Sequence, residues 1–302
     1  MNSSQIFDVI IIGGSYAGLS AAMSLGRAMR HVLVLDSNDP CNKRTPHSHN
    51  FVTQDGATPA AIRSKIIAEL QPYTTVQLKG ALVTNVTGND GAFEIQTEDE
   101  IFQAKKILFA TGVKNNLPDI PGFADSWGIS VLHCPYCHGY EIRNQPTGIF
   151  ANGANVMHMA KLINNWTKSL TVFTNGPAFL TDQERVLLTK NSIAVVEDSI
   201  INIAHRNGYI VQLEFENREA FKLNALYARL PFVQHTALPQ QLGCAINDDG
   251  FIVTDEMKKT SVKGVYAAGD NISMMRSVAN AVAAGSMAGA IINHELIEEE
   301  FK

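Results

Sequence analysis

Residues 8–28, "DVIIIGGSYAGLSAAMSLGRA", decide the fold class of this chain. The β-branched run 9–12 is typical of a parallel strand that is buried on both faces, and it leads into a glycine turn and a helix rich in alanine and leucine. The turn has the frame G-x-G-x-x-G, with Ser15 in the middle position. Such a turn lets the backbone approach a pyrophosphate, and the helix N-terminus offers N–H groups to the phosphates. The segment predicts an α/β fold with a dinucleotide site.

A second predicted strand, "HVLVLD", ends at Asp36, eighteen residues after Gly18. An acidic residue at this spacing can bind the ribose hydroxyls of an adenine dinucleotide. The alternative is a tight turn between strand and helix with an aspartate on the surface. The candidate cofactor-binding residues of this region are Gly13, Gly14, Ser15, Tyr16, Ala17, Gly18 and Asp36.

Length and composition narrow the class of protein. A chain of 302 residues can hold two domains that each bury a core,. The net charge of −5 gives no general attraction to nucleic acid or anionic lipid,. The longest apolar stretch near the C-terminus, 279–292, is too short to span a bilayer, and the N-terminus lacks a basic region and a cleavage site,. We therefore expect a cytoplasmic protein without a nucleic-acid or membrane partner, and we expect its tail, 294–302, to be a solvated, frayed helix end.

The four cysteines fall into a pair and two single residues. Cys134 and Cys137 stand in "HCPYCHGYE", 133–141. Zinc would need two further ligands, for which no second C-x-x-C or H-x₃₋₅-H motif exists, and a static disulfide is disfavoured in a reducing cytoplasm. A redox-active pair at a helix start, where the dipole stabilises a thiolate, is the preferred interpretation. Cys41 and Cys244 are interpreted as packing residues.

Two later segments repeat the pattern of a strand that ends in a glycine turn. Residues 104–113, "AKKILFATGV", end in such a turn, and residues 262–270, "VKGVYAAGD", are followed by a helix of small residues. Together with the first segment they resemble the FAD domain of the pyridine nucleotide–disulfide oxidoreductases. The resemblance implies bound FAD, with the 110–112 turn beside the flavin nucleotide, Asp270 on the ribityl chain and the last helix directed at the flavin ring. It adds these candidate cofactor contacts: Asn42, His49, Val83, Ala110, Thr111, Gly112, Asp270, Ser277 and Val278.

A second copy of the first strand–turn–helix unit lies in the middle of the chain. Residues 146–166, "PTGIFANGANVMHMAKLINNW", and the strand in 168–176 form this weaker internal repeat,. We expect two Rossmann-like dinucleotide-binding domains, the second inserted in the first. The split FAD-binding domain would cover 1–113 and 244–302, and the inserted NAD(P)H-binding-like domain 114–243 would carry the redox cysteines.

The cysteine pair at the start of the inserted domain resembles that of low-molecular-weight thioredoxin reductases. This resemblance implies a homodimer in which Cys137 faces the flavin and Cys134 exchanges with the substrate. The family usually has an aspartate after the second cysteine, and here His138 stands in its place. We expect this imidazole to hold or release a proton near neutral pH without a large pKa shift, although a structural role is the alternative. The candidate catalytic residues are Cys134, Cys137 and His138.

The electron donor is expected to differ from that of ordinary thioredoxin reductases, because "CPYCH" looks more like a side branch of that family. This branch includes the gliotoxin-type dithiol oxidases and NADPH-independent or ferredoxin-linked enzymes. The second turn, 151–156, has changed two of its three small residues, and 174–177 offers no arginine or lysine to a 2′-phosphate,. We expect exchange with a thioredoxin-like protein or a small dithiol, with ferredoxin as donor or oxygen as acceptor. The alternatives are a conventional NADPH-dependent thioredoxin reductase and a non-catalytic, flavin-bound redox sensor.

Overall fold

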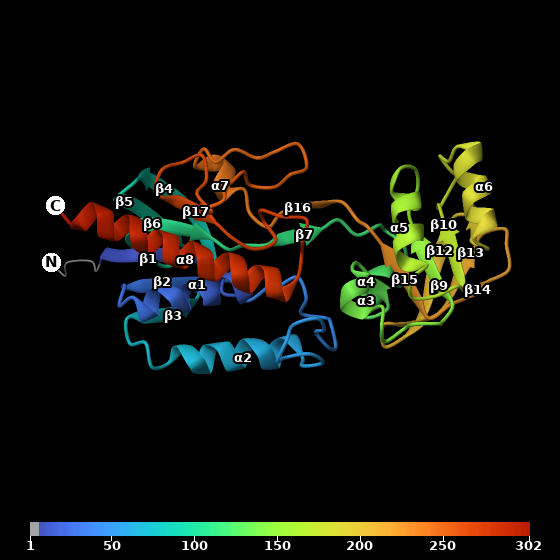
Figure 1. Ribbon diagram of the computed structural model, residues 1–302, viewed down its shortest axis with the longest axis horizontal. Helices are drawn as coiled ribbons and strands as arrows, with labels where there is room; N and C mark the ends of the chain where they lie inside the picture. Colours follow the sequence, from blue (N-terminus) through green and yellow to red (C-terminus); the bar gives the residue numbers. More distant parts are fainter. Residues whose placement is uncertain (1–5) are drawn as a thin grey trace. The chain divides into compact units, whose positions relative to one another are not determined.

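The computed structural model describes residues 6–302, so residues 1–5 of the predicted FAD-binding domain lie outside the described part (Figure 1). The chain forms two compact units. The first unit comprises Met1–Lys43, Pro59–Lys114 and Phe232–Lys302, and the second unit comprises Arg44–Thr58 and Asn115–Pro231. Strands β7 (Val113–Asn115) and β16 (Phe232–Gln234) pair where the chain passes from one unit to the other.

The observed bounds differ from the expected ones at two places. Residues 232–243 belong to the first unit because Leu238 packs into its core and Gln234 Nε2 donates to the backbone oxygens of Gly250 (2.7 Å) and Asn271 (3.0 Å). Residues 44–58 belong to the second unit, where the Arg44 guanidinium donates to the carbonyl oxygen of Ala124. Sequence patterns did not reveal either shift, because both depend on contacts between distant segments.

The first unit is built on a seven-stranded sheet. Its strands are β1 (Ile6–Ile12), β2 (Val32–Asp36), β3 (Val76–Gly80), β4 (Val83–Asn89), β5 (Ala92–Thr97), β6 (Ile101–Phe109) and β17 (Val265–Ala267). The order is β3-β2-β1-β6-β5-β4, and β17 also pairs with β6. Strands β3, β2, β1, β6 and β17 run parallel, while β5 is antiparallel to both β6 and β4. The carboxyl ends of the parallel strands therefore meet at one edge, where ligands of such sheets bind.

Helices α1 (Tyr16–Arg27) and α8 (Val278–Glu300) pack closely in this unit, as Figure 1 shows; α2 (Pro59–Leu70) and the short α7 (Leu238–Gln241) complete it. A Cβ atom on Gly285 would lie 2.0 Å from the carbonyl oxygen of Ala17, and one on Gly289 would lie 2.7 Å from that of Ala21. The small residues of α8 are therefore required for close contact between the two helix backbones. Ser277 caps α8, since its side-chain oxygen accepts from the N–H of Asn280.

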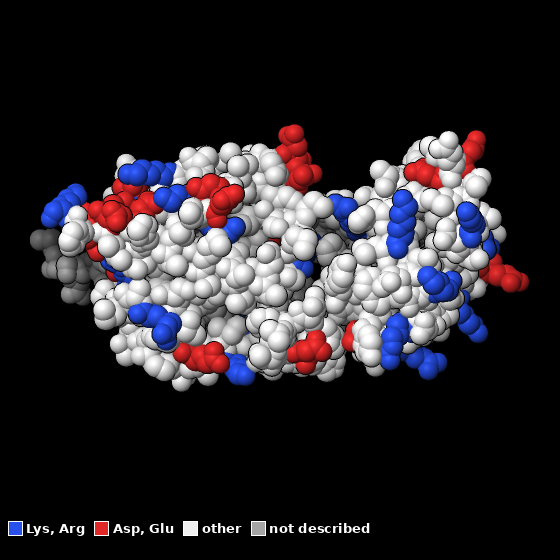
Figure 2. All heavy atoms as spheres, viewed as in Figure 1, with Lys and Arg blue, Asp and Glu red and all other residues white. Residues whose placement is uncertain are grey.

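The C-terminal end of α8 is held by ion pairs, so the expectation of a frayed end was wrong. Glu300 pairs with Arg30 (2.7 Å) and Lys105 (3.0 Å), and the fully buried Lys106 lies 2.6 Å from both Asp90 and Glu299. Figure 2 shows acidic and basic side chains mixed over this end of the first unit. None of the helices in residues 6–302 is both long and apolar enough to cross a membrane.

The second unit contains a five-stranded parallel sheet with the order β11-β10-β9-β15-β8. Its strands are β8 (Val131–Leu132), β9 (Thr147–Phe150), β10 (Leu170–Phe173), β11 (Ala194–Val196) and β15 (Ala225–Ala228). A smaller antiparallel sheet contains β12 (Ile200–Arg206), β13 (Tyr209–Phe215) and β14 (Phe221–Lys222). The helices are α3 (Phe123–Ser126), α4 (Pro135–His138), α5 (Asn155–Ile163) and α6 (Asp182–Lys190).

Both units thus place a glycine turn and a helix after an inner parallel strand, β1 in the first and β9 in the second. This arrangement confirms the predicted α/β class with two Rossmann-like units and the predicted internal repeat. Among the single cysteines, Cys244 is buried in the core of the first unit as expected. Cys41 as a whole residue is exposed, but burial raises the pKa of its thiol, and its sulfur lies 4.0 Å from the Asp270 carboxylate.

Candidate cofactor cleft and redox pair

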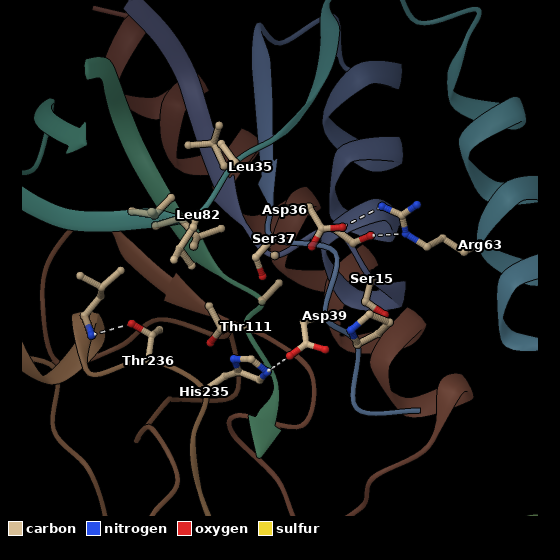
Figure 3. Close-up of a pocket in the computed structure, with 18 residues that line it drawn as sticks. Ser15, Leu35, Asp36, Ser37, Asp39, Arg63, Leu82, Thr111, His235 and Thr236 are labelled. Atoms are coloured by element: carbon tan, nitrogen blue, oxygen red, sulfur yellow. Dashed lines mark hydrogen bonds and ion pairs between the residues drawn. The ribbon is translucent and has the colours of Figure 1, made fainter. Parts of the chain in front are cut away.

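A cleft opens at the carboxyl ends of β1, β2 and β6 in the first unit (Figure 3). Its volume is about 640 Å³, including the solvent at its mouth. It brings together seven of the residues that the sequence analysis proposed as cofactor contacts, and these are Gly13, Gly14, Ser15, Asp36, Val83, Ala110 and Thr111. The cleft therefore lies where the first turn was predicted to receive a dinucleotide.

The glycines of the first turn are required by close backbone contacts. Gly13 has a φ of +107°, and a Cβ atom there would lie 2.3 Å from the carbonyl oxygen of Ala110 at the end of β6. A Cβ atom on Gly18 would lie 1.9 Å from the carbonyl oxygen of Gly13, and one on Gly14 would lie 2.8 Å from Asp36 Cβ. No side chain fits at these positions, so the floor of the cleft consists of bare backbone.

Asp36, the predicted ribose ligand, is held by an arginine that the sequence analysis missed. Arg63 of α2 donates from Nη2 to Asp36 Oδ2 (2.7 Å) and from Nε to the carbonyl oxygen of Gly14 (3.1 Å). This pair fixes the carboxylate at the rim of the cleft, as Figure 3 shows. Arg63 stands 27 residues after Asp36 in a helix that matches no motif, so only the folded structure could reveal it.

Two residues that line the cleft, Thr111 and Ser15, have hydroxyl groups without the hydrogen bonds expected at their positions. The Thr111 hydroxyl is buried and has no hydrogen-bond partner in residues 6–302. Ser15 occupies the N-cap position of α1, yet its side chain makes no capping hydrogen bond. Because buried polar groups are nearly always paired in folded proteins, the unpaired Thr111 hydroxyl points to a ligand. A bare glycine turn, a helix N-terminus and this hydroxyl together fit the diphosphate half of FAD.

The other predicted cofactor contacts of the first unit do not line this cleft. Tyr16, Ala17 and Gly18 are buried in α1, where the Tyr16 hydroxyl accepts from Asn42 Nδ2 (3.2 Å). Gly112 supplies the positive φ, +65°, that the turn after β6 needs. Burial raises the pKa of Asp270, whose carboxylate lies 3.5 Å from Arg276 Nε. Ser277 and Val278 form the start of α8. These residues keep their predicted cofactor roles only as proposals.

His49 was predicted to contact the cofactor, but it lies in the second unit and does not line the cleft. Its two ring nitrogens lie close to two carboxylates. Nδ1 is 3.6 Å from Asp55 Oδ2, and Nε2 is 3.7 Å from Glu141 Oε1. The loop 44–58 therefore adds an imidazole to the surroundings of the "CPYCHGYE" segment.

The redox pair is arranged for one sulfur to ionise easily. Cys137 Sγ donates to Cys134 Sγ across 2.9 Å, and Cys134 is the N-cap of α4. The pKa of Cys134 is lowered from 9.0 to about 7, chiefly by this hydrogen bond and further by the N–H groups of Cys137 and Tyr136, against the effect of burial. A substantial fraction of Cys134 is therefore thiolate at neutral pH, which is the nucleophilic form.

His138 behaves differently from the sequence-based expectation. Its pKa is lowered from 6.5 to about 4, first by burial and then by the charge of His49, while Glu141 acts in the opposite direction. The prediction of a histidine that titrates near neutral pH without a large shift was therefore wrong for this state of the protein. The local sequence did not indicate this burial, because "CPYCHGYE" has no apolar run. At neutral pH the side chain is a neutral imidazole.

In the second glycine turn, after β9, the side chain of Asn152 forms hydrogen bonds with the surrounding backbone. Asn152 Nδ2 donates to the carbonyl oxygen of Pro177 (2.9 Å), and Asn152 Oδ1 accepts from the N–H groups of Gly153 (2.9 Å) and Phe179 (2.8 Å). These bonds tie the turn to the segment that follows β10. The amide side chain thereby occupies turn groups that an open nucleotide site would offer to phosphates.

An acidic residue lies beside the same segment. Glu197 Oε2 accepts from the N–H of Ala178 (2.8 Å), and Glu197 Oε1 accepts from Arg185 Nη1 (2.9 Å). Arg185 is a basic residue that the sequence analysis did not consider, because it lies farther along in α6. Its ion pair with Glu197 means that a 2′-phosphate bound here would meet a carboxylate and compete for the arginine.

Comparisons with known proteins agree with this geometry. The sequence profile described as "Pyridine nucleotide-disulphide oxidoreductase" matches residues 7–285. Thioredoxin reductase aclD of Aspergillus oryzae is 31% identical over 99% of both chains, and thioredoxin reductase tcpT of Claviceps purpurea is 32% identical over 99% of this chain and 97% of that protein. An oxidoreductase from Agrobacterium tumefaciens has a similar structure, with a TM-score of 0.92, 34% identity and coverage of 97% of this chain and 99% of that one.

Proposed function

Because the chain belongs to the pyridine nucleotide–disulphide oxidoreductase family and is an oxidoreductase of the thioredoxin reductase type, we propose that it is an FAD-dependent enzyme that exchanges thiols and disulfides through Cys134 and Cys137. The observation that carries this proposal is the contact between the two sulfurs, 2.9 Å apart, with the pKa of Cys134 near 7. This geometry supports Cys134 as the nucleophile and Cys137 as the resolving thiol.

In the reducing direction, the Cys134 thiolate attacks a substrate disulfide, forms a mixed disulfide and releases the first substrate thiolate, which takes up a proton. Cys137 then loses its proton and attacks Cys134, so that the second substrate thiol leaves and an enzyme disulfide forms. Two electrons have passed from the cysteine pair to the substrate. His138 is the proposed acceptor of the Cys137 proton: its imidazole is neutral at neutral pH and can accept a proton, but its lowered pKa makes it a weak base,. A dithiol substrate reverses these steps.

The cleft of the first unit is the proposed FAD site. The Gly13–Gly18 turn and the N-terminus of α1 would hold the diphosphate, and Asp36, oriented by Arg63, would hold the adenosine ribose,. Thr111 would donate its unpaired hydroxyl to the cofactor. When bound, FAD supplies a two-electron store for the dithiol–disulfide couple. Asn42, His49, Asp270, Ser277 and Val278 are further proposed contacts.

The donor is proposed not to be NADPH. The second turn is bonded to its own Asn152, and Glu197 lies beside the segment that would face a 2′-phosphate. A ferredoxin-type protein as donor, or a dithiol substrate with oxygen as acceptor, needs neither of these sites. The named thioredoxin reductases among the relatives support a thioredoxin-like protein or a small dithiol as the exchange partner. We include a cytoplasmic homodimer in the proposal by resemblance.

Anaerobic stopped-flow spectroscopy of the yellow protein tests the donor. We expect millimolar NADPH to bleach the flavin slowly or not at all, whereas a dithiol bleaches it. Cys137→Ser should abolish bleaching by the dithiol, because the proposal places this sulfur toward the flavin. Chromatography of the cofactor released by heat should show FAD rather than FMN.

Three outcomes would overturn parts of this proposal. Rapid, stoichiometric bleaching by micromolar NADPH would make the protein a conventional NADPH-dependent thioredoxin reductase. Bleaching by a dithiol that persists in the Cys137→Ser variant would remove the pair from the path of the electrons. If neither NADPH nor a dithiol bleaches the flavin, reduced ferredoxin is the next donor to add, and a flavin that no donor bleaches would favour the non-catalytic sensor.

A further inference from the structure

Tyr227 is a buried residue of the second unit that the proposed reaction does not use. It lies in β15, which runs between β9 and β8. In the register of the parallel strands it stands opposite Ile149 on one side and Leu132 on the other. Leu132 is separated from Cys134 by a single residue. The strand order therefore places Tyr227 next to the backbone that leads directly into the redox pair.

Packing explains the ring of Tyr227 but not its hydroxyl. The residue is 1% exposed, and its hydrophobic cluster includes Leu132, Ile149, Val156 and Met159. The hydroxyl is buried and has no hydrogen-bond partner in the described part of the chain. A buried polar group without a partner destabilises a fold, and phenylalanine would fill the same space without this cost. The oxygen therefore points to a function outside packing.

The charges around this hydroxyl belong to the redox site. Burial raises the pKa of Tyr227, and negative charges on Cys134, Cys137 and Glu141 raise it further. The phenol thus keeps its proton over the whole physiological pH range. A neutral O–H donor that is reached by the charge of the cysteine pair can stabilise that charge once it forms.

We propose that the Tyr227 hydroxyl is a further catalytic group, which donates a hydrogen bond to the thiolate of the reduced Cys134–Cys137 pair. The proposal rests on the proposed function, since it needs the pair to ionise during exchange. No bond is made or broken at Tyr227, and its proton stays on oxygen. The donor lacks a partner while both sulfurs are protonated and gains one when the pair carries a negative charge.

A matched tyrosine in the first unit provides the control. Tyr266 is also 1% exposed, and its pKa is also raised by burial, but it lies beside Glu295 in the other unit. Tyr266→Phe therefore removes a buried phenol hydroxyl without removing a donor near the cysteines. Comparing Tyr227→Phe with Tyr266→Phe separates an effect on the redox pair from the general effect of deleting such a group.

The experiment is site-resolved alkylation of the reduced, flavin-loaded protein between pH 5 and 10, with peptide mass spectrometry reporting Cys134. In the unchanged protein we expect a midpoint below pH 7, because Tyr227 would add to the hydrogen bonds from Cys137 and the backbone N–H groups that already lower the pKa of Cys134 to about 7. Tyr227→Phe should raise the midpoint by about one pH unit, the scale of one hydrogen bond to a charged acceptor. Tyr266→Phe should leave the midpoint unchanged. The melting temperature of Tyr227→Phe should be equal to or higher than that of the unchanged protein.

The outcomes separate this inference from the proposal on which it rests. A midpoint near pH 9 in the unchanged protein would contradict Cys134 as the activated nucleophile, and so the proposed function. A midpoint at or below pH 7 that Tyr227→Phe leaves in place would overturn only the role of Tyr227. If Tyr227→Phe does not fold, infrared difference spectra of reduced protein with isotope-labelled tyrosine, taken at pH 6 and pH 8.5, give the answer. A tyrosine C–O band that does not shift between these spectra would equally reject the proposal.

Discussion

The turn after β1 and the turn after β9 hold the same place in their sheets, but their polar groups are satisfied in different ways. Around the first turn, the Thr111 hydroxyl is buried without a partner and Ser15 does not cap its helix. Around the second turn, Asn152 bonds to Gly153, Phe179 and Pro177. One turn keeps hydrogen-bonding capacity for a ligand, and the other uses its capacity within the protein.

This difference shows how a dinucleotide fold can keep its architecture without keeping a dinucleotide site. The strand, turn and helix of the second unit persist because they bury an apolar face, in which Val156, Met159 and Ile163 of α5 pack on the sheet. Binding depends instead on the few polar groups that the turn leaves unsatisfied. The following predictions test this division, from the largest expected effect to the smallest.

The largest effect is expected from a side chain in the first turn. Gly13→Ala places a Cβ atom 2.3 Å from the carbonyl oxygen of Ala110 at a φ of +107°, which an L-residue rarely adopts,. We expect the purified variant to lose its flavin almost completely, because the turn must move away from the position that receives the diphosphate. The ratio of flavin absorbance to protein absorbance measures this loss.

The control is the glycine that the second turn retains, which stands at the middle position of its frame, where the first turn has Ser15. Gly153 also has a positive φ, +64°, but the nearest atom to an added Cβ lies 4.0 Å away. Gly153→Ala should cost about 1 kcal/mol of stability through backbone strain and leave the flavin content unchanged. A loss of flavin in Gly153→Ala as large as that in Gly13→Ala would contradict the assignment of the cofactor to the first unit.

An intermediate effect is expected at His138. This residue tests whether the second unit has a catalytic role although the polar groups of its glycine turn are already hydrogen-bonded to Asn152. His138→Asn removes the proposed proton acceptor beside the pair and should slow thiol–disulfide exchange by roughly 10²-fold, the usual scale for general acid–base catalysis. The flavin content and the fold should not change. An unaltered single-turnover rate with a dithiol would leave His138 only a structural role.

The same variant tests the pH dependence that burial of His138 imposes. The pKa of this side chain is about 4 in the folded protein and 6.5 when it is solvated, so the unfolded chain binds more protons between these values,. The stability that depends on neutral His138 is therefore fully present above pH 6.5 and is lost as pH falls toward 4. Denaturant unfolding at pH 5 and pH 7 should show a smaller difference for His138→Asn than for the unchanged protein.

Much of the fold and part of the site could be predicted, because both follow from local patterns. The strand that leads into the turn at Gly13, the repeat at 146–166 and the helix start at Cys134 depend on residues a few positions apart. The residue types and their spacing indicate the local backbone geometry directly. The unit bounds could not be predicted in the same way, since residues 44–58 and 232–243 change units through contacts with segments far along the chain.

The missed features share a physical cause, because burial and ion pairs arise between distant residues. Arg63 reaches Asp36, and Glu300 pairs with Arg30 and Lys105, across gaps that no motif spans. The lowered pKa of His138 follows from its burial, which a polar local sequence did not suggest. The sequence shows that Asn152 belongs to the second turn. Only the structure shows that its side chain forms hydrogen bonds with the backbone of this turn and of the segment after β10.

The smallest expected effects come from deleting one polar group at each turn, and they should be opposite in kind. Asn152→Ala loses the bonds to Pro177 and Phe179, so we expect about 1–2 kcal/mol less stability and an unchanged flavin affinity,. Thr111→Val removes a hydroxyl without a partner in the described residues, so stability should not fall, while FAD should bind about 5- to 10-fold more weakly,. Denaturant unfolding of the apoprotein and titration with FAD measure the two quantities separately. A Thr111→Val variant that loses stability but binds FAD normally would mean that this hydroxyl serves the fold, and the contrast between the two turns would then rest on Asn152 alone.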